Sequence, residues 1–201
     1  MSANKILEPG FYNRPVTLVA RDLLGKRLVR VLNSIRVSGI IIETEAYDGV
    51  DDLACHARSG KTKRNAVMFG PAGFAYVYFV YGMHWCLNVV TGESGSPAAV
   101  LIRALEPLEG KEIFAQNRNH VKEQNWANGP AKLTSALAIS GVENGAALTS
   151  RADNLWIETG LDVPESEVLR SPRVGIQYAP EPWLSMPWRF LKIKPASGHS
   201  K

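Results

Sequence analysis

The amino-acid sequence predicts an α+β fold in a single compact domain. Its 201 residues suffice for one sizeable core, and 45% hydrophobic with 21% charged residues is typical of globular proteins. Strand-like and helix-like segments are mixed without the strict alternation that a parallel α/β sheet requires. No internal repeat or Gly/Ser/Pro-rich linker divides the chain. We therefore expect one domain over 1–201, with poorly ordered tails at 1–10 and 195–201.

The first part of the chain predicts one helix and two strands. The helix is expected over 14–28, where Pro15 suits the first turn and Gly25 suits the C-terminal cap. Strands are expected over 26–32 and 36–47, which are rich in β-branched and aliphatic residues.

A long loop and a hairpin follow. The loop is expected over 48–72, where Gly, Pro, Asp and basic residues show no period. Loops of this length in a compact domain are usually either functional or disordered. The segment 74–90 carries no formal charge, and its length is at the lower limit for a membrane span. However, Gly82, His84 and Asn88 interrupt it, and its Val, Tyr, Phe and Trp residues favour strands. We therefore predict a β-hairpin and no membrane span.

The remaining elements follow from the same patterns. The segment 98–105 is apolar at nearly every position, which predicts a strand buried on both faces. Helices are expected over 107–119 and 128–139. Short late strands are expected over 154–160, 172–179 and 188–194.

Charge and cysteine content narrow the function classes. The net charge of +4 and the isoelectric point of about 9.1 permit a polyanionic partner without specifying one. Cys55 and Cys86 form no disulfide framework, and neither they nor the four histidines have metal-ligand spacing. We therefore expect no metal and no cofactor. The first segment has no apolar region of the kind a secretory signal needs, so we expect an intracellular protein.

Two glutamates lie on one face of the second predicted strand. Alternate side chains of a strand point the same way, so Glu43, Glu45 and Tyr47 share that face. Carboxylates in a core strand are costly unless they are paired or functional. Arg103, inside an otherwise apolar strand, is a candidate partner. The group is either a structural ion pair at the end of a strand or an acid held beside a cation in a cleft.

Basic residues gather in the long loop. Lys61, Lys63 and Arg64 form either a solvated surface or a set of phosphate contacts. His56, in the same loop, is either a surface residue or a functional one. Lys132 follows a Gly-Pro pair at the start of a predicted helix, where free backbone N–H groups favour an anion.

The predicted hairpin bends near Tyr81. If its turn takes three residues, from Gly82 to His84, then Tyr78 opposes Asn88 and the two line one surface; a two-residue turn breaks this match. In either case Tyr81 lies beside the bend, where it either packs in the core or projects. A projecting flat side chain on a stiff hairpin can wedge between stacked bases.

Taken together, these segments resemble the alkyladenine (3-methyladenine) DNA glycosylase family. The resemblance rests on "ETEAY", "CHARSGKTKRNAVMF", "AYVYFVYGMHWCLNV" and "VLIRALEPLEG", and it continues through "NGPAKLTSALAI" and "PRVGIQYAPEPWLSMPWRF". It covers nearly the whole chain beyond the first ten residues. It implies a compact domain with a mostly antiparallel β-sheet, flanking helices, and a protruding β-hairpin that enters the minor groove of DNA.

The resemblance also implies roles for individual residues. Glu45 matches the catalytic glutamate, and Tyr81 matches the residue that fills the gap left by a flipped base. Asn88 matches the side chain that excludes a purine 2-amino group, and Lys132 falls in a helix that the family places near DNA. The remaining matches surround the flipped base: Tyr47, His56, Tyr78 and Arg103.

The activity implied is removal of alkylated or deaminated purines, namely the 3-methyladenine, 7-methylguanine, hypoxanthine and ethenoadenine class, from duplex DNA. A carboxylate such as Glu45 can stabilise positive charge on the sugar and take a proton from attacking water. The enzyme would therefore need no Schiff-base lysine, no lyase step and no cofactor. We expect a monomer located with DNA in the cytoplasm, nucleoid or nucleus.

Two other function classes remain open at this stage. A binding module could recognise flipped or single-stranded bases with the same pocket and leave the glycosidic bond intact. A structural or partner-binding protein could use the hairpin as a hydrophobic patch, and would show no salt-dependent affinity for DNA.

Overall fold

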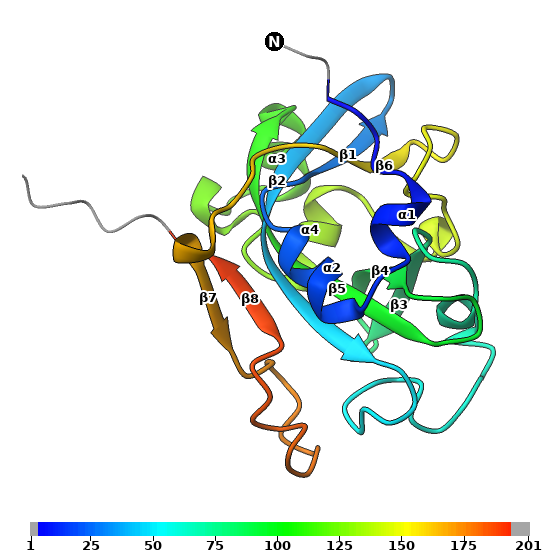
Figure 1. Cartoon of the computed structure of the whole chain (residues 1–201). Helices are drawn as coiled ribbons and strands as arrows, with labels where there is room; N and C mark the ends of the chain where they lie inside the picture. Colours follow the sequence, from blue (N-terminus) through cyan, green and yellow to red (C-terminus); the bar gives the residue numbers. More distant parts are fainter. Residues whose placement is uncertain (1–3, 194–201) are drawn as a thin grey trace, which may run out of the picture.

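The computed structural model describes residues 4–193, which form one compact domain built on a curled antiparallel sheet (Figure 1). The main path of the sheet has the strand order β3-β4-β5-β2-β1-β6, and β8 joins β2 while β7 pairs with β8. The predicted α+β class is confirmed. The strands are β1 (Arg27–Leu32), β2 (Ile35–Asp48), β3 (Ala75–Val80), β4 (His84–Thr91), β5 (Ala98–Glu109), β6 (Leu155–Glu158), β7 (Val168–Ser171) and β8 (Arg189–Lys192).

Within residues 4–193, four short α-helices flank the sheet. Helix α2 packs on the sheet beside β2, where the Thr44 hydroxyl donates to the Ala20 carbonyl at 2.7 Å. Helix α4 is tied to β4 because the Thr134 hydroxyl donates to the Trp85 carbonyl at 2.9 Å. The helices are α1 (Pro9–Tyr12), α2 (Val16–Asp22), α3 (Lys111–Asn117) and α4 (Pro130–Ala136), and 3₁₀ turns occur at Ala66–Phe69, Glu123–Asn125, Gly141–Glu143 and Glu165–Glu167.

Strand β2 is the central strand of the sheet. It pairs with β5 over nearly its whole length, and its first half pairs with β1 on the other edge. The pairing with β1 stops at Ile40. Beyond it, β8 lies on the same edge of β2 and pairs with Glu43, Thr44 and Glu45. Irregular register against β5 around Glu43 bends the strand at this point. The two glutamates therefore lie where β5 and β8 both flank β2.

The sheet has apolar residues on both faces. One face packs against α2 and α4 and forms the main core, with Val19, Leu28, Ile102 and Leu133 fully buried. On the other face, the loop 49–73 supplies Cys55, Ala57 and Met68, which pack against Tyr76, Val90 and Ala99. The predicted long loop is therefore a cover for the sheet.

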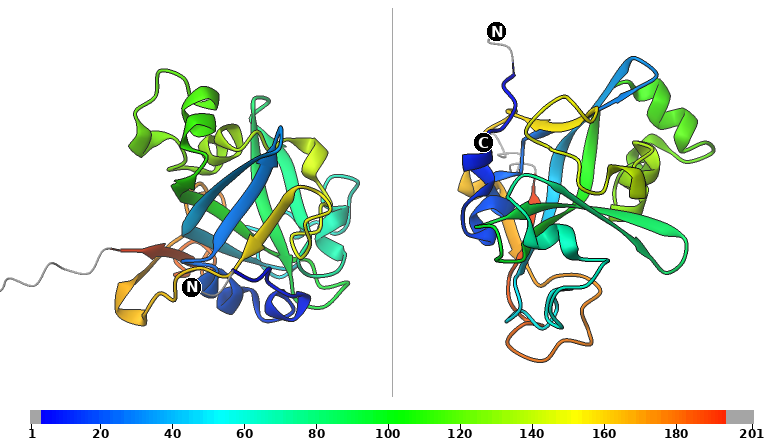
Figure 2. Two further views of the ribbon diagram at one scale, coloured as in Figure 1. Left: turned by 90° about the horizontal axis from the view of Figure 1, so that it is seen from above. Right: turned by 90° about the vertical axis from the view of Figure 1, so that its right-hand side faces the viewer.

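The β3–β4 hairpin projects from the body of the molecule (Figure 2). Val80 pairs with His84, so the three-residue turn consists of Tyr81, Gly82 and Met83. Of the two turn lengths considered from the sequence, the three-residue turn is present, but it begins one residue earlier than Gly82, because Tyr81 itself takes the left-handed conformation with φ +54°. The shift moves the partner of Asn88 from Tyr78 to Tyr76.

Several predicted elements differ from the structure. The segment 172–179 forms turns and no strand, because the Val174 N–H bonds to the Glu45 carboxylate and Gly175 has φ +81°. Strand β7 was not predicted, since it is short and half of its residues are exposed.

Part of the predicted N-terminal tail belongs to the fold. Of the predicted tails, residues 4–10 are described: Ile6 bridges Glu158, and Pro9 begins α1. Leu7 is buried in the main core. The rest of the two predicted tails, 1–3 and 195–201, lies outside the described residues.

Gly25 offers a test of this packing. A Cβ at Gly25 would lie 2.4 Å from the Leu161 carbonyl oxygen, and its φ is +82°. Gly60 has the same φ but open space around it. We expect Gly25→Ala to lower the free energy of unfolding by about 2 kcal/mol more than Gly60→Ala, as measured by urea denaturation. Equal losses for the two variants would contradict the packing described.

Candidate active site

The carboxylate of Glu45 is fully buried and bonded by three donors. Its Oε2 accepts a hydrogen bond from the Tyr47 hydroxyl at 2.9 Å and one from Arg103 Nη1 at 3.2 Å. Its Oε1 accepts from the Val174 backbone N–H at 2.7 Å. The three donors come from β2, β5 and the segment before residue 180, so the carboxylate orientation is fixed from three directions.

Burial raises the pKa of Glu45 above its ordinary value. Arg103, the Val174 amide and the Tyr47 hydroxyl act in the opposite direction and lower that pKa. Burial is the largest of these effects, so the group is a stronger base than a free glutamate.

Arg103 joins Glu45 to Glu43. Its Nε donates to Glu43 Oε1 at 2.7 Å, and its Nη1 donates to Glu45. Arg189 on β8 also donates to Glu43 Oε1, at 2.7 Å. The predicted proximity of the two glutamates and Arg103 is therefore confirmed, and Glu43 bridges two arginines.

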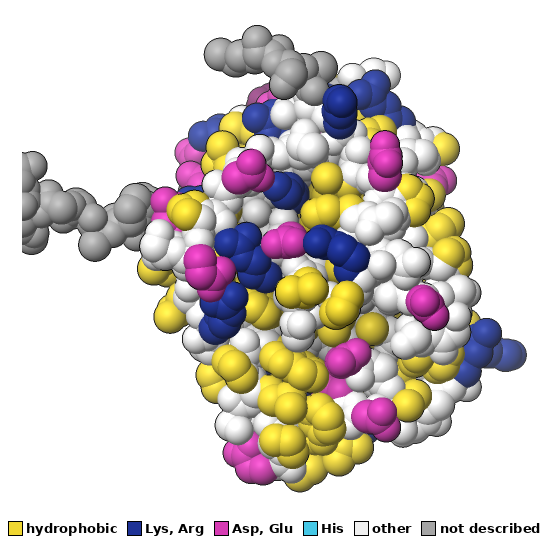
Figure 3. Space-filling model, in the orientation of Figure 1, with side chains coloured by type: hydrophobic (Ala, Val, Ile, Leu, Met, Phe, Trp, Pro, Cys, Tyr) yellow, Lys and Arg dark blue, Asp and Glu magenta, His cyan; other side chains and the backbone are white. Residues whose placement is uncertain are grey.

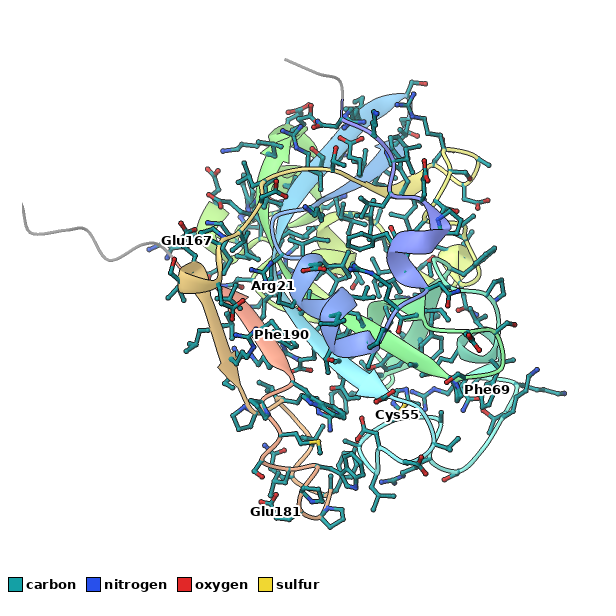
Figure 4. All side chains as sticks on the ribbon, in the orientation of Figure 1. Arg21, Cys55, Phe69, Glu167, Glu181 and Phe190 are labelled. Atoms are coloured by element: carbon teal, nitrogen blue, oxygen red, sulfur yellow. The ribbon has the colours of Figure 1, made fainter. Side chains whose placement is uncertain are left out.

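A cavity of about 260 Å³ lies directly beside this group. All three donors to Glu45 line it, through Tyr47, Arg103 and Val174, although Glu45 itself does not. Cys55, labelled in Figure 4 on the loop that follows β2, contributes to another part of its wall. Ligand pockets commonly have about 300–1,000 Å³, so this one suits a small ligand of the size of a single base.

One wall of the cavity is aromatic. Tyr76 and Tyr78 stack with their ring centroids 5.3 Å apart, and His56 meets Tyr78 edge-on at 4.5 Å. The His56 Nδ1 lies 3.1 Å from the Tyr76 hydroxyl oxygen. His56 thus lies against the cavity wall, although the residue as a whole is exposed to solvent.

Tyr47 reaches the same cavity from a different strand. Two strands, β4 and β5, separate β2 from β3 in the sheet, and the curl of the sheet brings Tyr47 and Tyr78 to one space. Burial raises the pKa of Tyr47 well above its ordinary value, and the neighbouring Glu45 raises it further. The hydroxyl of Tyr47 therefore stays protonated and acts as a donor.

Asn88 lies deep in the cavity on β4 and is 4% exposed. Its Nδ2 donates to the Tyr76 carbonyl at 3.0 Å, which fixes the orientation of the amide. Tyr78 lies opposite Cys86 and not opposite Asn88 as predicted. A shift of two residues preserves the face of a strand, so Tyr78 and Asn88 still line one surface.

Tyr81 lies at the outer end of the hairpin and also contributes to the cavity lining. Its side chain is 82% exposed, so it is not part of the core. Met83, in the same turn, is 66% exposed. The hairpin therefore presents two large apolar side chains to solvent at its tip.

The predicted basic residues are exposed but differ in their contacts. Arg64 donates to the Phe79 carbonyl at 3.0 Å, and its guanidinium lies 5.3 Å from the Tyr78 ring centroid. Lys61 lies over the Phe69 ring at 5.7 Å. Lys132 donates to Asn128 at 2.7 Å, next to Pro130 and Ala131 in the cavity wall. Lys63 lies in the same loop as Lys61.

Residues 4–193 offer neither a metal-ion cluster nor a membrane-spanning helix. In this part of the chain, no three His, Cys, Asp or Glu side chains are grouped so that they could hold a metal ion. Nor does any described helix have the length and apolarity needed to cross a bilayer. Both cysteines are buried free thiols, and burial raises the pKa of Cys55 to about 11.

Comparison with known proteins identifies the family. A family model described as methylpurine-DNA glycosylase matches residues 10–195. The chain belongs to the methylpurine-DNA glycosylase family. It is thus a hydrolase of N-glycosyl bonds with a role in DNA repair, as the resemblance in the sequence implied.

Individual relatives agree with this assignment, and each is named as a candidate 3-methyladenine DNA glycosylase. A protein from Methanocella arvoryzae is 50% identical over 186 residues, covering 92% of this chain and 91% of the relative. One from Carboxydothermus hydrogenoformans is 49% identical over 185 residues, covering 92% and 94%. One from Myxococcus xanthus is 46% identical over 184 residues, covering 92% and 88%.

Several residues of the glycosylase site were not singled out from the sequence. Val174 was assigned to a strand, yet its backbone N–H bonds Glu45. Tyr76 is not among the predicted site residues, yet it lies in the cavity wall. Arg173 and Asp52 form a buried ion pair behind Tyr47. In the sequence Pro172-Arg173-Val174-Gly175, the proline and the glycine favour a turn around the arginine. This is the local signal that could have pointed to the role of the segment.

The environment of His56 leads to a pH-dependent prediction. Burial, followed by repulsion from Arg64 and Arg58, lowers the pKa of His56 to about 4. The unfolded chain takes up this proton near pH 6.5. Between these pH values the unfolded state binds more protons, so the His56 contribution to stability is lost as pH falls from about 6.5 to 4. We expect an NMR titration to show neutral His56 at pH 6.

Arg64→Gln should raise that pKa because it removes a repelling charge, whereas Arg151→Gln, at Trp156, should leave it unchanged. A native His56 that titrates near 6.5 would contradict the environment described.

Proposed function

We propose that the protein is a monofunctional DNA glycosylase that flips alkylated or deaminated purines out of duplex DNA and hydrolyses their N-glycosidic bond. The proposed substrates are the 3-methyladenine, 7-methylguanine, hypoxanthine and ethenoadenine class. The whole chain, 1–201, forms one glycosylase domain in this proposal. The protein acts as a monomer on DNA in the cytoplasm, nucleoid or nucleus.

The observation that carries the proposal is the Glu45 carboxylate, bonded by three cavity-lining residues beside a space of the size of one base. Breaking the bond between a sugar and a purine builds positive charge on the sugar. A fixed carboxylate in a low-dielectric site stabilises that charge and accepts a proton from the attacking water. The raised pKa of Glu45 suits it to the second task.

Water as the nucleophile agrees with the composition of the cavity. No lysine is among the described residues that line it, so no amine is placed there for a Schiff base. A purine alkylated at N3 or N7 is already cationic and leaves without a general acid. A neutral base such as hypoxanthine needs protonation, for which an ordered water is the proposed donor.

The aromatic residues offset the cost of extruding a base. Flipping costs a few kcal/mol of stacking and pairing. Stacking on Tyr47 and Tyr78 returns roughly 1–3 kcal/mol per base, and a cationic base gains a further cation–π attraction. Tyr81, exposed at the tip of the hairpin, fills the vacated position in the duplex. Damaged cationic purines are thus favoured over normal ones.

Asn88 provides discrimination by exclusion. Its amide is buried and bonded to the Tyr76 carbonyl, so moving it aside for a larger ligand would cost this hydrogen bond. The exocyclic 2-amino group of guanine would crowd it, which disfavours guanine. 7-Methylguanine carries the same group, and its cationic ring offsets part of this cost through cation–π attraction. His56 completes the aromatic wall, and Arg103 orients the carboxylate.

The exposed cations contact the DNA backbone in this proposal. Lys61, Lys63 and Arg64 lie on the loop beside the hairpin, and Lys132 lies beside the cavity wall. Contacts of this kind supply affinity without sequence preference and weaken as salt rises.

Glu45→Gln tests the catalytic role. We expect at least a 1,000-fold loss in the rate of 3-methyladenine and hypoxanthine release, measured as alkali-labile sites in duplex DNA, because the amide can neither accept the proton nor balance the charge. Binding to damaged duplex should remain. Glu106→Gln, on an exposed part of β5, is the matched control. Release by Glu45→Gln at the wild-type rate would refute the mechanism; binding without release by the wild type would indicate a binding module.

Tyr81→Ser tests the role of the hairpin tip. We expect base release to fall about 10-fold or more, because no side chain then fills the position that the flipped base leaves in the duplex. The melting temperature should change by less than about 2 °C, because Tyr81 is exposed. Leu18→Ser, also an exposed apolar residue, is the control for surface substitution. A large drop in melting temperature for Tyr81→Ser would show instead that Tyr81 supports the fold.

A further inference from the structure

Behind the cavity wall lies a buried arginine that the proposed mechanism does not use. The side chains of Arg173 and Asp52 are both completely inaccessible to solvent. Arg173 donates from both terminal nitrogens to the two carboxylate oxygens of Asp52, with Nη2 to Oδ1 at 3.0 Å. Its Nη1 also donates to the Ala46 carbonyl at 2.9 Å, and its Nη2 to the Trp183 carbonyl at 3.3 Å.

The guanidinium of Arg173 lies between two aromatic rings. Its carbon is 4.8 Å from the Tyr47 ring centroid and 5.0 Å from the Trp188 ring centroid. Tyr47 lines the cavity and Arg173 does not, so the arginine supports the side of Tyr47 that faces away from the base. Trp188 belongs to the segment 172–188, over which apolar side chains gather in the lower part of Figure 3, and Glu181 marks the tip of this segment in Figure 4.

Asp52 connects the same ion pair to the loop after β2. Its carboxylate accepts the backbone N–H of Asp48 at 3.1 Å and that of Ala54 at 3.0 Å. Ala54, Cys55 and His56 all line the cavity. Asp52 therefore determines how this loop leaves β2 and approaches the cavity.

The residue after Arg173 contacts the carboxylate itself. The Val174 N–H donates to Glu45 Oε1, and the Arg173 side chain holds Ala46, the next residue of β2. Arg173 and Val174, which are consecutive in the chain, thus hydrogen-bond to Ala46 and Glu45, which are consecutive in β2. One ion pair joins β2, the loop 49–73 and the segment 172–188.

A buried ion pair adds little net stability, because desolvation offsets its attraction, and apolar residues of similar size often stabilise as well. What the forked guanidinium provides is a defined geometry, with each hydrogen bond in one plane. The contact with the Tyr47 ring adds a second constraint on the position of the guanidinium.

We propose that Arg173, locked to Asp52, is a positioning residue that holds the Tyr47 ring and the Glu45 carboxylate in their reactive orientation before a damaged base enters. This inference rests on the proposed function. Arg173 acts through Tyr47 and Val174, and it touches neither the base nor the water.

A paired substitution tests this role without leaving a buried charge unpaired. Asp52→Asn/Arg173→Met keeps an acceptor for the Ala54 N–H and an apolar side chain beside Tyr47. We expect its single-turnover rate of hypoxanthine release to fall about 10- to 100-fold, since small misplacements of reacting groups cost this much. Its affinity for duplex DNA containing a tetrahydrofuran abasic analogue should change by less than about 3-fold, because the hairpin and the exposed cations set it.

Two further variants separate positioning from structural support. Arg173→Lys keeps the charge but loses the fork, so its release rate should stay at least 5-fold below wild type while binding persists. Arg14→Met removes an arginine that lies 4.7 Å from the Phe11 ring centroid and pairs with the partly exposed Asp22, and should release base at the wild-type rate.

Wild-type release by the paired variant would overturn the inference. So would a parallel loss of release and of binding, which would indicate general structural damage. Failure of the wild-type protein to release any base, assayed alongside, would refute the proposed function and this inference with it.

Discussion

A buried carboxylate is the constraint on which the site depends. Glu45 is stable in the interior only because a strand neighbour, an arginine from β5 and a backbone amide from a distant segment all donate to it. Each of those donors lies at the cavity wall. The hydrogen bonds that stabilise the buried Glu45 carboxylate therefore also hold three residues of the cavity wall in place. The same contacts stabilise the fold and shape the site.

The position of β2 explains how so many segments reach one carboxylate. It is flanked by β5 on one edge and by β1 and then β8 on the other. Arg103 and Arg189 approach from those two neighbours and balance Glu43 and Glu45. The curl of the sheet then brings β3 toward the end of β2, and the loop 49–73 closes the remaining side. In a flat sheet, the two strands between β2 and β3 would hold Tyr47 and Tyr78 apart on their common face.

Much of this was predictable, for reasons that particular residues show. The apolar pattern predicted β1, β2, β5 and the hairpin, and the cost of burying charge predicted that Arg103 would pair with Glu43 and Glu45. The resemblance placed Tyr47, His56, Tyr78 and Asn88 around one pocket, and the structure brings these four side chains to one cavity. The hairpin register was missed because a tyrosine, and no glycine, begins the turn in the left-handed region.

The sequence by itself determined the family, the α+β class and the chemical types available to the site, because these follow from local patterns and from motifs a few residues long. Only the tertiary structure decided that Val174 bonds Glu45 across 129 residues and that Arg173 pairs with Asp52 across 121. Neither contact has a local signature: a backbone N–H is present at every residue except proline, and a lone arginine is usually solvated. Their partners are selected by the folded sheet, which brings the segment 172–188 against β2.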